Sequence, residues 1–144
     1  MGRLLAIDYG KARTGIAVTD PQHIIATPLN TIPTPQLLPF LVDYARQEEV
    51  ERFVVGMPLQ TDGTPSENMA RVRPFVGRLH KLLPDIPIDL YDERYTTILA
   101  HQALHAAGKS TQSLRRDKGL IDKVSACILL QDYIRSQTAQ NDNL

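Results

Sequence analysis

Apolar positions in the first part of the chain recur in the pattern of extended strands. Residues 3–9 and 15–20 form two apolar segments on either side of a glycine-containing turn, which predicts a β-hairpin. A third extended segment is expected around 24–32. Because proline cannot donate a hydrogen bond to a sheet ladder, Pro28 and Pro33 predict that this third strand lies at an edge of the sheet.

Downstream of the hairpin, the chain alternates between helical and extended patterns. Apolar residues recur at helix spacing in four segments, at about 35–48, 69–83, 97–107 and 120–136. Two short apolar runs between them, FVVGM at 53–57 and IPIDLY at 86–91, predict buried strands. Strands that alternate with helices favour parallel pairing. The sequence therefore predicts an α/β fold with a mixed five-stranded sheet and helices packed on it.

A chain of 144 residues, 42% of them hydrophobic and 22% charged, has the size and composition of one compact domain. We expect that domain to span residues 1–136, and residues 137–144, which lack an apolar period, to form a frayed tail. No run of about 18 apolar residues occurs, and the first residues lack the pattern of a signal peptide. The sequence thus predicts a cytoplasmic protein without a membrane segment.

Sixteen lysine and arginine residues balance sixteen aspartate and glutamate residues. Any nucleic-acid site must therefore be a local patch and not the result of overall charge. The single cysteine, Cys127, excludes an internal disulfide, and its apolar neighbours predict an inert buried thiol. His101 and His105 have a spacing that can chelate a metal ion, but HQALH lacks the glutamate of the HExxH motif, so we interpret both as surface residues.

The most unusual residue of the predicted core is Asp8, an acid at the end of an apolar strand. An ionised carboxylate in a medium of low dielectric constant is costly unless it is paired or binds a cation. Two interpretations therefore stand: Asp8 is a cation ligand, or it hydrogen-bonds to amides of the adjacent turn. Spacing alone does not choose between them.

Further carboxylates occur at two other element boundaries. Asp92 and Glu93 follow a predicted strand and precede a helix, a position where ligands gather in helix-connected sheets but where acids also cap helices. Asp122 is expected in the first turn of the last helix, where the helix dipole favours an acid. Ser125 and Ala126 are small enough for this helix to lie close to the sheet and bring Asp122 toward the strand carboxylates.

Basic residues near these acids could contact phosphates, although isolated surface charges are usually only solvated. They are Lys11, Arg13, Arg94, Arg115, Arg116 and Lys118. Gly56 and Pro58, at the end of a central strand, would let a ligand approach the backbone, but a tight exit from the strand has the same composition. The chain has no serine nucleophile elbow and no GxxxxGK[ST] loop, so acyl transfer and P-loop NTP hydrolysis lack support.

Four segments, taken in order, resemble the YqgF family, whose members are described as pre-16S ribosomal RNA nucleases or Holliday junction resolvase-like proteins. These segments are LLAIDYGKARTGIAVTD, FVVGMPLQTDGTPSENMARVRPFVGRL, DERYTTILAHQAL and IDKVSACILLQDYI. Together they cover nearly the whole chain. The resemblance implies a ribonuclease H-like fold, related to the RuvC resolvases, and a hydrolase that acts on nucleic acid.

The resemblance also implies roles for individual residues. Asp8 matches the acid of the family's first strand, Glu93 the acid of its DER motif and Asp122 the acid of its last helix, so these three are expected to be catalytic and to hold metal ions. Asp92 is expected to orient or cap, and Arg94 to reach a scissile phosphate. Hard oxygen ligands favour Mg²⁺ or Mn²⁺ over zinc. Lys11, Arg13, Arg115 and Arg116 complete the expected substrate-binding set.

One position departs from the family pattern, and several functions stay open. Ala12 stands where the family commonly has lysine, between Lys11 and Arg13, which leaves the role of that basic side chain open. An RNA nuclease that matures the 5′ end of 16S rRNA is favoured over a DNA junction resolvase. The pattern DxGxxxxG at 8–15 also resembles a phosphate loop of actin-like ATPases, although those proteins need two such domains. A non-catalytic, ribosome-associated binding module is a further alternative.

Overall fold

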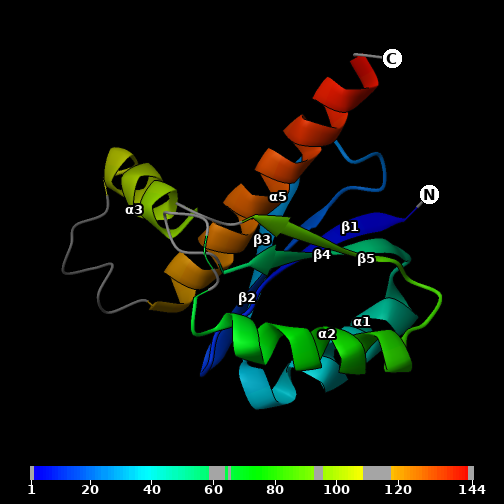
Figure 1. The fold of residues 1–144 in the computed structure, drawn as a ribbon. Helices are drawn as coiled ribbons and strands as arrows, with labels where there is room; N and C mark the ends of the chain where they lie inside the picture. The colour runs from blue at the N-terminus through cyan, green and yellow to red at the C-terminus, as the bar shows by residue number, and fades with distance from the viewer. Residues whose placement is uncertain (1, 59–63, 65, 93–95, 109–117, 143–144) are drawn as a thin grey trace.

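The fold is a five-stranded sheet with helices on both faces, shown by a computed structural model that describes residues 2–58, 64, 66–92, 96–108 and 118–142 (Figure 1). The strands lie in the order β3-β2-β1-β4-β5. Their bounds are Arg3–Asp8 for β1, Arg13–Thr19 for β2, Ala26–Pro33 for β3, Val50–Met57 for β4 and Ile88–Asp92 for β5. The first three strands pair antiparallel, whereas β1, β4 and β5 run parallel. The predicted mixed α/β sheet is confirmed.

Two layers of helices cover the sheet (Figure 1). Helices α1 (Leu37–Gln47), preceded by a 3-10 turn at Thr34–Gln36, and α2 (Met69–Leu82) lie on one face. The long helix α5 (Lys118–Asp142) crosses the other face, and α3 (Thr96–Ala106) packs beside it. Among the described helices, none is both long enough and apolar enough to cross a membrane.

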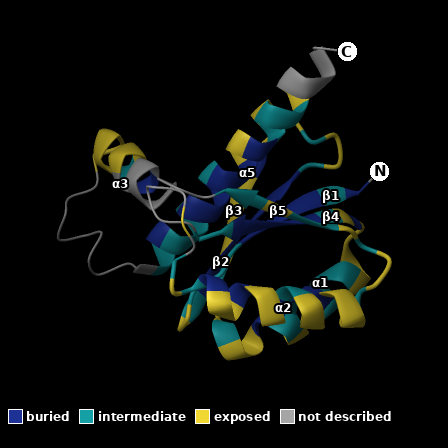
Figure 2. Cartoon of the chain, viewed as in Figure 1, coloured by how far each residue is buried: buried dark blue, intermediate teal, exposed yellow. Residues whose placement is uncertain are grey.

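The central strands of the sheet are largely buried between the two helical layers (Figure 2). The alternation of side chains along the strands creates two separate cores, one on each face of the sheet. Leu5 and Ile7 of β1 point toward α1 and α2, where they pack with Phe53, Phe75 and related residues. Leu4 and Ala6 point the other way and pack against Ala126, Leu129 and Leu130 of α5. Because successive strand residues face opposite sides, the same alternation fixes the face of each residue at the strand ends.

Most predicted elements are confirmed, but several begin or end at other residues than predicted; β4, for example, begins at Val50 and not at Phe53. The strand carrying Pro28 and Pro33 is an edge strand, as expected. Strand β2 begins at Arg13, earlier than predicted, because Arg13 and Thr14 pair with β3 although both are polar. Helix α5 begins at Lys118, so Asp122 lies beyond its first turn. The same helix continues to Asp142, past the predicted end near residue 136, because extending a helix that has already formed carries no new cost of nucleation.

Candidate active site

The carboxyl ends of three parallel strands meet at one edge of the sheet. Asp8 is the last residue of β1, Met57 of β4 and Asp92 of β5. The register joins Ile7 to Val55 and Met57 to Asp92, so these ends are neighbours. Ligands in helix-connected sheets gather at this edge.

Asp8 and Asp122 lie on the same face of this edge. Asp8 pairs across the hairpin with Gly15, and the side chains of such a pair point to the same side. A β-carbon placed on Gly15 would lie 2.0 Å from the backbone oxygen of Asp122, so α5 passes directly over Gly15. The Asp8 side chain therefore points to the face that carries Asp122, as the packing of Ala6 also indicates.

Helix α5 lies close to strand β2 because both elements have small residues where they meet. Ser125 and Ala126 are buried, as predicted for residues that let the helix lie on the sheet. Gly15 supplies the matching gap in β2. Sequence reasoning placed Gly15 at the start of a predicted strand and missed the contact, because a glycine beside a turn gives no sign of what crosses above it. The hydroxyl of Thr31 donates a hydrogen bond to the Gly119 oxygen and fixes the start of the helix against β3.

Arg13 forms an ion pair with Asp122, from its guanidinium Nε to the carboxylate Oδ2. The Asp122 side chain is 22% exposed and the Arg13 side chain 42% exposed. Burial raises the pKa of Asp122 above its ordinary value, and the hydrogen bond and charge of Arg13 oppose that rise. Since Asp122 is not in the first turn of α5, the helix dipole explains its position poorly. In the described structure, Asp122 pairs with Arg13 of strand β2.

The turn after Asp8 is held by hydrogen bonds from outside the hairpin. The Thr34 hydroxyl donates to the Gly10 oxygen at 2.7 Å, and the Thr34 amide donates to the Ala12 oxygen at 3.0 Å. The Asn68 side-chain amide donates to the Tyr9 oxygen at 2.7 Å. These contacts fix the backbone on the carboxyl side of Asp8.

A shallow depression lies beside this turn. It is lined by Lys11, Ser66, Glu67, Asn68 and Arg71. Lys11 was predicted to bind substrate, and it is exposed here. Sequence reasoning missed Arg71, because an exposed arginine on an amphipathic helix has the composition of an ordinary solvated surface. Two of the side chains that line the depression are basic, Lys11 and Arg71, and one, Glu67, is acidic.

Asp92 lies on the opposite face of the sheet from Asp8. Tyr91 packs with the core beneath α5, and the Asp92 side chain, one residue further along β5, faces the side where Ile88 packs. Asp92 is therefore not placed to hold the same metal ion as Asp8 and Asp122, which agrees with the predicted role of orienting or capping. Glu93, Arg94, Arg115 and Arg116 lie outside the described residues, so the roles predicted for them stay predictions.

The structure also places the cysteine, one of the two helical histidines and the glycine that the sequence analysis singled out. Cys127 is buried, as expected for a core thiol. His105 is exposed, as expected for a surface residue, whereas the side chain of His101 lies outside the described part of the chain. Gly56 is buried at the end of β4 opposite Tyr91, and its predicted role in admitting a ligand stays a prediction.

The donor set at the edge fits a hard divalent cation. No group of three potential ligands from His, Cys, Asp and Glu occurs among the residues that the structure describes. Asp8 and Asp122 nevertheless contribute carboxylate oxygens from the same face, and Mg²⁺ and Mn²⁺ prefer such ligands. The buried hydroxyl of Ser125, one turn from Asp122, has no hydrogen-bond partner in the described part of the chain, so a polar group is available nearby.

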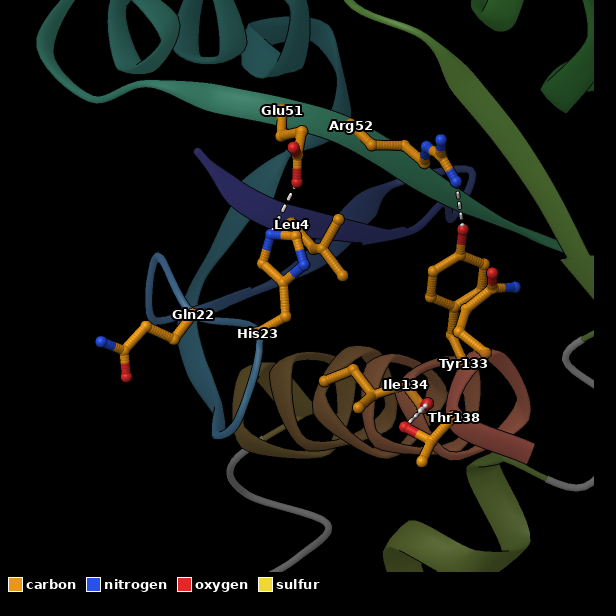
Figure 3. Close-up of a pocket in the computed structure, with 9 residues that line it drawn as sticks. Leu4, Gln22, His23, Glu51, Arg52, Tyr133, Ile134 and Thr138 are labelled. Atoms are coloured by element: carbon orange, nitrogen blue, oxygen red, sulfur yellow. Dashed lines mark hydrogen bonds and ion pairs between the residues drawn. The ribbon is translucent and has the colours of Figure 1, made fainter. Parts of the chain in front are cut away.

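A second cavity lies at the far end of the sheet (Figure 3). It has a volume of about 390 Å³ between the start of β1, the start of β4 and the carboxyl-terminal half of α5. His23 Nε2 lies 2.7 Å from Glu51 Oε2 there, and Arg52 Nη1 donates to the Tyr133 hydroxyl at 2.9 Å. These side chains are paired with one another, and the cavity contains neither Asp8 nor Asp122.

The sheet order and the helices that cover both faces define a ribonuclease H-like fold, the fold of RuvC. A solved structure described as Thermus thermophilus RuvC in complex with Holliday junction substrate matches this fold with a TM-score of 0.56 and 14% sequence identity. The match covers 94% of this chain and 96% of that one. At this identity the likeness concerns the fold.

The chain belongs to the RuvX family, described as Holliday junction resolvase, whose sequence profile matches residues 2–136. A Phocaeicola vulgatus relative named "Putative pre-16S rRNA nuclease" is 51% identical over 137 residues, 95% of this chain and 98% of the relative. A Porphyromonas gingivalis relative of the same name is 51% identical over 134 residues, 93% of this chain and 96% of the relative. The predicted resemblance to the YqgF family is thereby confirmed. Membership of this family identifies the protein as a nuclease, which is a hydrolase.

Proposed function

We propose that this protein hydrolyses phosphodiester bonds of precursor 16S rRNA in the cytoplasm, with Asp8, Glu93 and Asp122 holding Mg²⁺ or Mn²⁺. The observation that carries the proposal is the position of Asp122 over Gly15, because Gly15 pairs with Asp8 and both acids then face the same side of one edge. The name shared by the Phocaeicola vulgatus and Porphyromonas gingivalis relatives supports the RNA substrate.

The chemistry of the carboxylates supports a role in phosphodiester hydrolysis. Bound divalent ions activate a water molecule and stabilise the leaving oxygen in such sites. The protein's part is to hold its acidic side chains in place. Asp8 is fixed by the hydrogen-bonded turn that follows it, and Asp122 by the contact of α5 with Gly15. Glu93 joins them through the resemblance of the DER segment to the family motif.

The basic residues supply contacts to the phosphate backbone. Lys11 and Arg71 line the depression beside the turn, and Arg13 lies at the edge itself. We assign Arg94, Arg115 and Arg116 to the same substrate path from the sequence. Because the net charge of the chain is zero, these local contacts, and not overall attraction, must position the nucleic acid.

A four-way DNA junction is the second candidate substrate. It is favoured by the family description as Holliday junction resolvase and by the fold shared with RuvC. Both candidates use the same edge of the sheet and the same acids. They differ in the shape of nucleic acid that must fit the basic path.

The test compares both substrates under matched conditions. Pure protein is incubated with a 5′ precursor fragment of 16S rRNA or with a four-way DNA junction, in Mg²⁺ or Mn²⁺ and in excess chelator. We expect metal-dependent cleavage of the RNA and its loss in Asp8→Asn. Asp43→Asn, which changes an exposed acid on α1, is the matched control and should cleave normally. Cleavage of the junction alone would replace the RNA substrate, and undiminished cleavage in chelator would end the metal hypothesis.

A further inference from the structure

We propose that Arg13 is an internal counter-ion of Asp122. When a metal ion binds, Arg13 releases the Asp122 carboxylate to the ion and then binds a substrate phosphate. The inference rests on the proposed function, since it requires Asp122 to be a metal ligand. Its starting observation is the ion pair between Arg13 Nε and Asp122 Oδ2, which joins the hairpin to α5 across 109 residues of sequence.

Arg13 and a metal ion would compete for the negative charge of the Asp122 carboxylate. Asp122 is largely withdrawn from water, and a carboxylate in such a place needs a compensating positive charge. Arg13 supplies that charge when no other cation is bound. A divalent ion held by the Asp122 carboxylate would weaken this ion pair, because the two positive charges repel each other and share the charge of one carboxylate. The free energy of the Arg13–Asp122 ion pair stabilises the metal-free site. The same free energy therefore opposes the binding of a metal ion.

The structure allows the Arg13 side chain to leave without moving the sheet. Its backbone is fixed in β2 by pairing with Pro33 of β3. Its side chain is 42% exposed, so the guanidinium can turn toward solvent about its own side-chain bonds. The backbone of Arg13 stays at the same edge of the sheet, so the released guanidinium would remain within reach of a phosphate bound there. A guanidinium has paired donors that match two phosphate oxygens.

Arg52 offers a matched comparison within the same chain. It also projects from a strand and is 40% exposed, but it is held by two partners, the Tyr133 hydroxyl at 2.9 Å and the Asp89 carboxylate at 3.9 Å. It lies at the other end of the sheet, beside the second cavity (Figure 3). A change at Arg52 removes a strand arginine and its ion pair without touching the proposed site.

The exchange predicts two effects of opposite sign for Arg13→Gln. Metal binding should become tighter, because the competing charge is gone, while RNA binding in the presence of metal should become weaker, because a phosphate contact is gone. A residue that only stabilised the local fold would change both affinities in the same direction. Glutamine retains a donor that can reach the Asp122 carboxylate.

The experiment measures the two affinities separately on the full chain. Mn²⁺ is titrated by calorimetry without nucleic acid, and a labelled precursor 16S fragment is titrated by fluorescence anisotropy in Ca²⁺. For Arg13→Gln we expect Mn²⁺ to bind about two- to fivefold tighter, the range for losing a competing, partly exposed ion pair, and the RNA to bind more weakly. Arg52→Gln should leave both affinities unchanged. Arg13→Lys, which keeps the charge but not the paired donors, should bind Mn²⁺ like the wild type and bind RNA less tightly.

The outcomes separate the two proposals. Equal or weaker Mn²⁺ binding by Arg13→Gln, in a protein whose Mn²⁺ binding is lost in Asp122→Asn, overturns the counter-ion role and leaves the proposed function standing. Absence of Mn²⁺ binding by the wild type overturns the metal site itself and, with it, this inference. A change of the same size in Arg52→Gln would also overturn the inference, because the effect would then not belong to the site.

Discussion

Gly15 and Asp122 are in backbone contact: a β-carbon on Gly15 would lie 2.0 Å from the Asp122 oxygen. Gly15→Ala should therefore push α5 away from the sheet. We expect the free energy of unfolding to fall by about 3 kcal/mol, the upper range for overpacking a core. Cleavage by the folded fraction should also fall, since Asp122 moves with the helix. Urea denaturation and cleavage assays on the same preparations measure both.

Gly77→Ala is the control for that substitution. Gly77 lies inside α2, and a β-carbon there would meet no atom within 4 Å. Alanine should raise the free energy of unfolding by about 0.5–1 kcal/mol, because glycine is a poor helix former. Cleavage should not change. If Gly15→Ala behaved like Gly77→Ala, the close contact between β2 and α5 would be wrong.

Asp122→Asn should separate function from stability. Burial raises the pKa of Asp122, so the folded protein bears a cost for ionising it, and a neutral residue of the same shape removes that cost. The lost ion pair with Arg13 is partly exposed and offsets this gain, so the free energy of unfolding should change by less than about 1 kcal/mol. Cleavage should fall sharply. Near wild-type turnover with a lowered melting temperature would instead assign Asp122 to its helix and remove it from the site.

Tyr133→Phe should cost stability but not activity. The Tyr133 hydroxyl donates to Asp89 Oδ2 at 2.7 Å and accepts from Arg52 Nη1 at 2.9 Å, at the far end of the sheet from Asp8. Losing these bonds should lower the free energy of unfolding by about 1–2 kcal/mol, while the edge-on packing with Tyr91 is kept. Tyr91→Phe, which removes an exposed hydrogen bond to Asp132, should cost less. Thermal melts of the two variants give the comparison.

Asp20 should make the loop before β3 sensitive to acid. Its pKa is lowered from 3.8 chiefly by the backbone hydrogen bond from Ile25, with further bonds from Ile24 and Gln22. The folded pKa lies below the unfolded one, so the stabilisation is complete above the unfolded value and disappears as the pH falls through the folded value. The difference in unfolding free energy between wild type and Asp20→Ala should therefore shrink below pH 3.8. A difference that persists under strongly acidic conditions would contradict the role of the ionised carboxylate.

Much of the fold could be predicted because it follows from periodicity and from proline. Pro28 and Pro33 identified the edge strand, and the two short apolar runs at 53–57 and 86–91 identified β4 and β5. Element ends were less certain. The polar residues Arg13 and Thr14 belong to β2 because β3 offers them partners, and this register is not visible in a local pattern.

The candidate site was predictable only in part. Asp8 stood out because an acid in an apolar strand is costly, but Asp122 was indicated by family resemblance and by its small neighbours Ser125 and Ala126. The partner of Arg13 lies 109 residues away, so no local pattern could identify their ion pair. Arg13 was predicted to contact phosphates, and the structure adds that it already contacts one of the proposed metal ligands.

Helix α5 follows every strand of the sheet in the chain, yet it provides half of one core and one side of the candidate site. During synthesis, the hairpin and the later strands can therefore assemble while Leu4, Ala6 and Val54 still present an apolar face to solvent. Contacts between distant segments form slowly, because a long loop must close first. The nascent protein therefore exposes this apolar surface until α5 docks, and the same docking step brings Asp122 to the edge of the sheet that carries Asp8.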